Sequence, residues 1–254
     1  MKDLDGKIAL VSGAGSGIGR AAALAFAGRG ATVIVSGRTP ARLRQSVDLI
    51  ANAGGAAVSK RADVTKPAQV RALVEFCLKR FGRLDYAFNN AGVEGDVADT
   101  VRCSEANWGR VIDTNLRGVW LCMKYEIPAM LKNGGGAIVN NCSEDGLNGA
   151  PNAPAYCASK HGVIGLTKTA ALEYAHLGVR VNAVCPGWIK TEMSARFIKD
   201  NAEIEEALHN SHPIGRMGTA EEVAAAVLWL CSDAASFVTG HALSVDGGSM
   251  AGRI

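Results

Sequence analysis

Short runs rich in Val and Ile alternate along the chain with longer amphipathic or alanine-rich segments. This alternation is typical of repeated βαβ units, in which a helix connects each strand to the next parallel strand. The short runs are apolar almost throughout, which indicates strands that are covered on both faces. We expect strands at residues 7–11, 32–35, 56–61, 86–89, 137–141, 180–184 and 242–245, and helices at residues 17–28, 40–53, 67–81, 105–131, 156–177 and 220–230.

This order of elements predicts an α/β fold: a single doubly wound domain of the Rossmann type, with a seven-stranded, mostly parallel sheet between two helix layers. The length of 254 residues fits one such domain, and no internal repeat, low-complexity tract or linker divides residues 1–254. One irregular stretch, residues 188–217, carries mixed charge and ends in a Pro-Ile-Gly sequence. We expect this stretch to be a mobile segment that covers the substrate.

Composition and charge exclude several classes of protein. The 27 basic and 24 acidic residues are scattered and give a net charge of +3, so no nucleic-acid partner is indicated. The longest apolar runs, such as residues 224–230, are too short to span a bilayer and residues 1–6 are polar, so we expect a cytoplasmic protein without a membrane partner. The seven cysteines contain no Cys-x-x-Cys pair and the five histidines do not cluster, so no metal site is expected.

A glycine-rich sequence, Ser-Gly-Ala-Gly-Ser-Gly-Ile-Gly at residues 12–19, follows the first expected strand and begins the first expected helix. Glycines here let the backbone turn sharply and approach a pyrophosphate, whose charge is met by free N–H groups and the helix dipole. A tight turn without a ligand is the alternative. The sequence favours dinucleotide binding by Ser12, Gly13, Gly15, Ser16, Gly17, Ile18 and Gly19.

Tyr156 and Lys160 are four residues apart on an expected helix, so their side chains lie on one face within mutual reach. A tyrosine in water ionises near pH ~10 and is a poor base at neutral pH. A nearby ammonium and a nicotinamide cation would both favour the phenolate. The pair is therefore a candidate for proton transfer, although an isolated pair of this kind would more simply be a surface contact.

Taken together, the motifs resemble those of the short-chain dehydrogenase/reductase family. The glycine loop is similar to the family's Thr-Gly-x-x-x-Gly-Ile-Gly, with Ser12 where the family usually has Thr. Other matching motifs follow in the family's order over almost the whole chain: Asp63-Val64, Asn89-Asn90-Ala91-Gly92, Asn115, Ser143, Tyr156-Cys157-Ala158-Ser159-Lys160 and Pro186-Gly187. The overall likeness falls between bacterial enzymes named glucose dehydrogenase and those named 3-oxoacyl carrier-protein reductase.

The resemblance implies four catalytic residues. In the family, the tyrosine exchanges a proton with the substrate oxygen while the nicotinamide exchanges a hydride with the attached carbon, and the lysine also holds the cofactor ribose. These roles fall to Tyr156 and Lys160. Ser143 is expected to donate to the oxygen on which negative charge grows. Asn115 is expected to support a local helix distortion and a water that relays protons through Lys160.

The resemblance also assigns residues at the strand ends to the cofactor. Asp63 should accept hydrogen bonds from the adenine amino group, and the Val64 backbone should help to fix the ring. Asn90, Ala91 and Gly92 should run beneath the adenosine ribose, and Pro186, Gly187, Ile189 and Thr191 should lie beside the nicotinamide.

The end of the second strand predicts which cofactor is preferred. Enzymes that choose NAD place a carboxylate there, which binds the ribose hydroxyls and repels a 2′-phosphate. Gly37 stands at that position, followed by Arg38, whose guanidinium can hold a phosphate in a bidentate contact. NADP(H) is therefore expected to be preferred and NAD(H) to be possible, since Arg38 could instead stack on adenine and Ser16 is not basic.

These residues predict an NAD(P)-dependent oxidoreductase that interconverts a secondary alcohol and a ketone. The alternative is a catalytically silent NAD(P)-binding regulatory protein, but such relatives usually lose the Tyr or the Lys. A hydrolase using Ser143 or Cys142 is disfavoured because no Gly-x-Ser-x-Gly sequence precedes a helix. The resemblance further implies a homotetramer, in which the helices at 105–131 and 156–177 pair with their copies.

The substrate is less determined, and it is expected to be a small molecule. Acidic and amide side chains near the nicotinamide motifs suggest a polar or polyhydroxylated substrate, whereas aromatic side chains and a methionine suggest a ring or an alkyl face. A sugar, a cyclic alcohol and a 3-oxoacyl thioester remain open. The candidate substrate residues are Glu94, Glu144, Asn148, Trp188, Met193 and Phe197.

Overall fold

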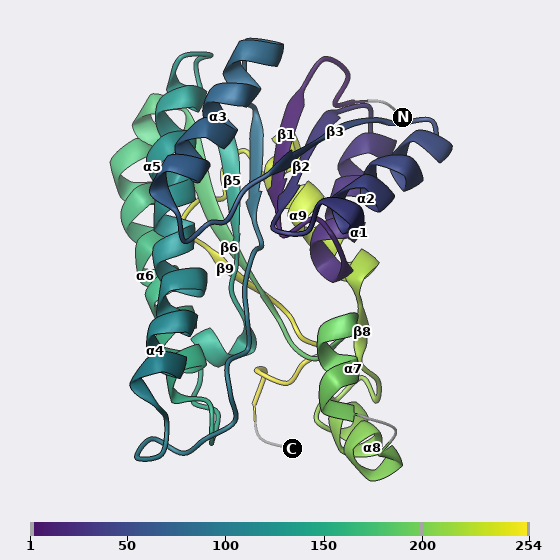
Figure 1. The fold of residues 1–254 in the computed structure, drawn as a ribbon, viewed down its shortest axis with the longest axis vertical. Coiled ribbons are helices and arrows are strands. Elements are labelled where there is room, and N and C mark those ends of the chain that lie inside the picture. Colours follow the sequence, from purple (N-terminus) through teal and green to yellow (C-terminus); the bar gives the residue numbers. More distant parts are fainter. Residues whose placement is uncertain (1–2, 199–200, 253–254) are drawn as a thin grey trace.

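A seven-stranded parallel sheet forms the centre of the molecule (Figure 1). The computed structural model describes residues 3–198 and 201–252. The strand order is β3-β2-β1-β4-β5-β6-β9, and it reverses direction between β1 and β4, which confirms the doubly wound topology. The strands are β1 (Ile8–Ser12), β2 (Thr32–Gly37), β3 (Ala56–Arg61), β4 (Tyr86–Asn89), β5 (Gly136–Asn141), β6 (Val179–Pro186) and β9 (Ala242–Val245).

Helices cover both faces of the sheet because successive strand residues point to opposite sides. From β1, Ala9 and Val11 pack on one layer, whereas Ile8 and Leu10 pack on the other. The first layer consists of α1 (Gly17–Gly28), α2 (Pro40–Asn52) and α9 (Ala220–Cys231), and the second of α3 (Pro67–Phe81), α5 (Gly118–Leu131) and α6 (Pro154–Tyr174). The central strands are covered on both faces, as expected, but the edge strand β3 is only partly buried. None of the described helices is long and apolar enough to cross a lipid bilayer.

The helix expected at 105–131 is interrupted. It consists of α4 (Glu105–Val111), a π-helical turn (Ile112–Arg117) and α5. The local helix distortion that the resemblance implies at Asn115 is thus present as a π-turn, a feature too short to be recognised from sequence periodicity. The turn places Asn115, which is buried, toward the interior of the domain.

The stretch at 188–217 is more regular than expected. It contains β7 (Ile189–Lys190), α7 (Glu192–Ile198) and α8 (Ala202–Asn210), and β7 pairs with β8 (Gly218–Thr219) in a small second sheet. Helices of this length are too short to show a clear period in the sequence. Figure 1 shows α7 and α8 standing apart from the main helix layers, below the carboxyl ends of the strands. The mobility of this segment stays a prediction.

Candidate active site

The carboxyl ends of the central strands open onto one cavity of about 1080 Å³. It lies where the strand order reverses, the usual ligand position in open α/β sheets. Every predicted cofactor residue except Gly19 lines it, as do Ser143, Tyr156 and Lys160. The structure therefore brings together residues that are far apart in the sequence.

The glycine loop between β1 and α1 packs directly against the loop after β4. A Cβ added at Gly13, where φ is +66°, would lie 2.7 Å from the Asn90 side-chain nitrogen, so only glycine fits. The Ser12 hydroxyl accepts hydrogen bonds from the backbone N–H of Asn90 (3.0 Å) and Ala91 (3.2 Å). Gly19 packs against the Gly13 carbonyl, which explains why it lies outside the cavity although the motif requires it.

The amino end of α1 is suited to bind a pyrophosphate. Ser16 stands at the N-cap without a side-chain hydrogen bond, and the first turn carries no acidic residue. The helix dipole and free N–H groups therefore face the cavity, and the first turn of the helix itself carries no acidic side chain that would compete for them. Thr191, at the far wall, packs against Gly17, where a Cβ would lie 3.3 Å from its methyl carbon. The glycine loop and the amino end of α1 thus fit a dinucleotide of the NAD(P) type.

Arg38 and Asp63 lie at the adenine end of the cavity. The Asp63 Oδ1 atom accepts hydrogen bonds from the backbone N–H (2.9 Å) and hydroxyl (2.8 Å) of Thr65. Burial opposes ionisation, but these hydrogen bonds and the positive charge of Arg38 hold the pKa of Asp63 below its usual value. Asp63 is therefore an ionised acceptor, fixed in orientation, with Oδ2 free of partners among the described residues.

Two charged residues that the sequence did not single out as a pair also meet here. Arg42 of α2 forms an ion pair of 2.9 Å with Glu192 of α7, and both line the cavity. The sequence signal for Glu192 was weak, because it is one of several exposed acids in the covering segment.

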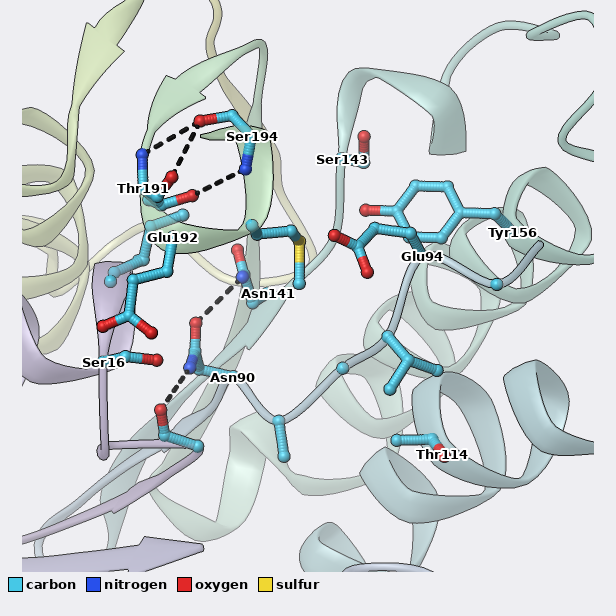
Figure 2. Close-up of a pocket in the computed structure, with 18 of the residues that line it drawn as sticks. Ser16, Asn90, Glu94, Thr114, Asn141, Ser143, Tyr156, Thr191, Glu192 and Ser194 are labelled. Atoms are coloured by element: carbon cyan, nitrogen blue, oxygen red, sulfur yellow. Dashed lines mark hydrogen bonds between the residues drawn. The ribbon is translucent and has the colours of Figure 1, made fainter. Parts of the chain in front are cut away.

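Ser143, Tyr156 and Lys160 meet at the other end of the cavity. Ser143 directly follows β5, and the other two lie one turn apart on α6. Figure 2 shows Ser143 and Tyr156 bordering the same part of the cavity, and both residues line it. The Lys160 Nζ atom lies 5.3 Å from the centroid of the Tyr156 ring and donates a hydrogen bond to the Asn141 carbonyl at 2.8 Å.

In the protein without the cofactor, the pKa of Tyr156 lies above its usual value. Burial raises the pKa of Tyr156, the negative charge of Asp145 raises it further, and the Ser143 hydroxyl opposes the shift only in part. Burial also lowers the pKa of Lys160. Burial destabilises the phenolate because it loses its hydration, and the attraction of the Lys160 ammonium does not make up for that loss. Tyr156 therefore stays protonated without the cationic nicotinamide.

Asn115 lies behind the cavity and does not line it. Its side chain donates to the Val93 carbonyl and accepts from the Val93 N–H, both at 2.8 Å. It also donates to the Ser159 hydroxyl at 3.2 Å, and Ser159 donates to the Tyr156 carbonyl at 2.7 Å. Asn115 thus joins the loop after β4 to the turn of α6 that carries Tyr156, while the proton-relay water remains a prediction.

Asn141 is a functional residue that the sequence analysis missed. Its side chain donates to the Asn90 Oδ1 atom at 3.0 Å, and its carbonyl holds Lys160. Figure 2 shows this contact between the ends of two strands. Two adjacent asparagines at the end of an otherwise apolar strand were the available signal.

The substrate end has one apolar wall and one acidic wall. Trp188 and Phe197 pack edge to face with ring centroids 5.5 Å apart, and Met193 lines the cavity beside them. Opposite, Glu94 pairs with Arg196 at 3.3 Å, and Glu144 accepts a hydrogen bond from Ser249.

The assignment of Asn148 to the substrate pocket is wrong. Its side chain is exposed, lies outside the cavity and contacts the Met250 sulfur at 3.0 Å. The turn after Glu144 directs it toward the C-terminal segment, because the chain reverses there in a short 3₁₀ helix (Glu144–Gly146). The other five candidate substrate residues line the cavity.

Comparisons with known proteins agree with this geometry. Residues 13–250 match the family described as enoyl-(acyl carrier protein) reductase. The chain is 50% identical to cyclohexanol dehydrogenase of Acinetobacter sp. (strain SE19) over 241 residues, covering 95% of this chain and 94% of that protein. The solved structure of levodione reductase superposes with a TM-score of 0.95 at 36% identity, covering 98% of this chain and 100% of that one.

A variant of actinorhodin polyketide ketoreductase, whose crystal structure contains NADPH, superposes with a TM-score of 0.93 at 38% identity, covering 98% of this chain and 99% of that chain. The family match covers residues 13–250, and the match to cyclohexanol dehydrogenase covers 95% of the chain. The chain therefore belongs to the short-chain dehydrogenase/reductase family, as an NAD(P)-dependent oxidoreductase acting on CH–OH groups.

Proposed function

We propose that this enzyme interconverts a secondary alcohol and a ketone on an uncharged substrate about the size of a six-membered ring. The observation that carries the proposal is the meeting of Ser143, Tyr156 and Lys160 at one end of a cavity whose other end fits a dinucleotide. The catalytically silent alternative is disfavoured because all three side chains are present and oriented toward the same space.

The proposed mechanism assigns one task to each side chain. When bound, the nicotinamide exchanges a hydride with the carbon that bears the reacting oxygen. The Tyr156 phenol gives its proton to that oxygen during reduction and becomes a phenolate, and the phenolate takes the proton from the alcohol during oxidation. Ser143 donates a hydrogen bond to the same oxygen as negative charge grows. Lys160, held by Asn141, supplies positive charge beside the ring and holds the ribose.

The walls of the substrate end favour a neutral ring. Trp188, Phe197 and Met193 offer an apolar face. Two arginines that line the cavity near these walls are already paired, Arg196 of α7 with Glu94 and Arg110 of α4 with Asp96 at 2.7 Å. Among the described residues, neither guanidinium is therefore free to bind an anionic group of the substrate. The similarity to cyclohexanol dehydrogenase supports the same substrate class. The similarity to a polyketide ketoreductase keeps a 3-oxoacyl thioester as the alternative.

NADP(H) is the proposed cofactor, with NAD(H) as a possible second one. Gly37 provides no carboxylate to repel a 2′-phosphate, and Arg38 is exposed at the cavity rim. We further propose that α7 and α8, within residues 188–217, form the cover that closes over the substrate, because α7 contributes Met193 and Phe197 to the wall.

A homotetramer in the cytoplasm is also proposed. A second hollow lies between the two long helices and is lined by Leu116, Trp120, Gly162, Gly165 and Leu166 among others. Trp120 is 42% exposed there, which suits a second copy of the helix pair. Val163 and Ile164 face the sheet instead. Light scattering at micromolar concentration should give the mass of four chains, and a stable monomer would contradict the proposal.

A substrate screen tests the proposed function. Ring alcohols and ketones, sugars and a 3-oxoacyl thioester are each supplied with NADP(H) or NAD(H), and the absorbance of the reduced cofactor is followed. We expect turnover of ring compounds, and a loss of kcat of about 10²–10⁴-fold in Tyr156→Phe, which removes only the exchangeable proton. Cofactor binding by Tyr156→Phe should stay nearly unchanged. Near-normal kcat in this variant would refute the mechanism.

A further inference from the structure

Glu94 lies beside the reacting groups without a place in the mechanism above. It follows the turn after β4, lines the same cavity as Tyr156, and its side chain is 22% exposed. Figure 2 shows the Glu94 carboxylate turned toward the Tyr156 phenol, on the side that Ser143 also faces. Its negative charge contributes to the raised pKa of Tyr156, which agrees with this proximity. A substrate whose oxygen contacts Tyr156 therefore comes close to this carboxylate.

The loop that carries Glu94 is held in place. The preceding residue, Val93, is fixed through both its N–H and its carbonyl by the buried Asn115 side chain at 2.8 Å. A site held by a rigid neighbour loses little entropy when a ligand binds. Asn115 thus holds the loop that presents Glu94 to the cavity, and it also supports the helix that carries Tyr156.

The Glu94 carboxylate has acceptor capacity left. Its Oε1 atom accepts one hydrogen bond from Arg196 at 3.3 Å, and its Oε2 atom has no hydrogen-bond partner within residues 3–198 and 201–252. The neighbouring carboxylate of Glu144, in contrast, already accepts a hydrogen bond from Ser249. An ionised carboxylate can accept at both oxygens, so Oε2 can take a donor from a ligand.

The chemistry of that donor follows from the charges around it. An anionic group would be repelled by Glu94. A second cation is poorly suited, because Arg196 already balances the charge of Glu94. A neutral hydroxyl group donates to a carboxylate without adding charge, and such charge-assisted hydrogen bonds are stronger than neutral ones. A hydroxyl beyond the reacting carbon fits these requirements.

We propose that Glu94 is a specificity-determining residue that accepts a hydrogen bond from a second hydroxyl of the substrate, so that the enzyme prefers ring diols and hydroxyketones to ring compounds with a single oxygen. This inference rests on the proposed function, since it assumes that a ring alcohol or ketone reacts at Tyr156.

The test compares cyclohexanol with the 1,2-, 1,3- and 1,4-cyclohexanediols in the full-length enzyme with its preferred cofactor. Wild type should show a higher kcat/KM for at least one diol than for cyclohexanol. Glu94→Ala should lower kcat/KM for that diol by about 10–100-fold, the range expected for a hydrogen bond to a charged group, mainly through KM. Cyclohexanol should change by less than about threefold. Glu94→Gln keeps an acceptor oxygen and should retain part of the preference, which a merely structural role would not predict.

Asp99→Asn is the matched control. Asp99 lies on the same loop, outside the cavity, so its variant loses one negative charge without changing the site. It should leave the preference for the diol intact. Equal losses on diol and cyclohexanol in Glu94→Ala, or no diol preference in wild type, would overturn the inference and leave the proposed function standing. No turnover of any ring alcohol or ketone would overturn both.

Discussion

Arg42 and Glu192 form an ion pair of 2.9 Å between α2 and α7, two elements on opposite walls of the cofactor cavity. The Arg42 side chain also packs over the glycine loop, where a Cβ at Gly15 would lie 3.1 Å from the Arg42 Cβ atom. Both charged side chains are about half exposed, at 55% and 54%. The pair therefore contributes little to stability, but it holds a guanidinium that a phosphate of the cofactor would attract.

The first prediction is that Glu192 competes with the cofactor for Arg42. Glu192→Gln should tighten NADPH binding by about 2–5-fold, the size of an exposed ion pair, and NADH binding less. Arg42→Gln should weaken NADPH binding, and the double variant should behave like Arg42→Gln alone. Fluorescence titration of the reduced cofactors measures all three. The exposed Arg71–Glu75 pair on α3, at 3.6 Å, gives the control: Glu75→Gln should change neither affinity. Weaker NADPH binding in Glu192→Gln would contradict this prediction and show that the Arg42–Glu192 pair supports cofactor binding.

The second prediction concerns Arg38. Arg38→Ala should lower kcat/KM for NADP by about 10–100-fold, as the loss of a charge-assisted contact implies, and should affect the NAD value much less. Paired kinetics with both cofactors in wild type and variant decide the matter. A wild-type enzyme that already favours NAD would contradict the NADP preference.

The third prediction separates Lys160 from Tyr156. Lys160 is buried, donates to Asn141 and faces the Tyr156 ring, so Lys160→Ala should impair both turnover and cofactor binding. Tyr156→Phe should impair turnover alone. Titration of both variants with the reduced cofactor, beside single-turnover rates, distinguishes these effects. Unchanged cofactor affinity in Lys160→Ala would remove the lysine from the ribose site.

The fourth prediction concerns stability and pH at Glu126, a buried carboxyl on α5. Burial raises its pKa to about 7, although it accepts a hydrogen bond from the Asn89 side chain at 2.9 Å. The folded state then binds more protons than the unfolded state between its unfolded pKa and about 7, so this contribution to stability is full at low pH and is lost as pH rises through about 7.

Glu126→Gln removes the titrating group and keeps an acceptor for Asn89. Urea unfolding gives the free energy of unfolding of the variant and of wild type at pH 5 and at pH 8. The difference between the two proteins should shift in favour of the variant from pH 5 to pH 8, by up to about 3 kcal/mol. Glu75→Gln, exposed on α3, serves as the control without such a trend. An equal effect of Glu126→Gln at both pH values would show that the carboxyl does not titrate in this range.

The sequence determined the layer order and most element positions in advance. The apolar run of β1 and the prolines at the first turns of α2 and α3 are local signals, because strand burial and helix starts depend on nearby residues. The resemblance to the family then predicted which residues at the strand ends bind the cofactor. The helix distortion at Asn115 was expected only from the family resemblance, and the short helices of the covering segment were not predicted, since neither feature leaves a clear period in the sequence.

What the sequence by itself determined is the kind of chemistry: a glycine loop for a dinucleotide and a Tyr-Lys pair four residues apart on a helix. Only the tertiary structure decided which polar side chains meet them. Asn141 holds Lys160, Glu192 pairs with Arg42, and Asn148 turns away from the cavity. The physical reason is that motifs depend on spacing along the chain, whereas hydrogen bonds, ion pairs and the pKa of Tyr156 depend on distance and burial in space, which arise only when separate strands and helices pack together.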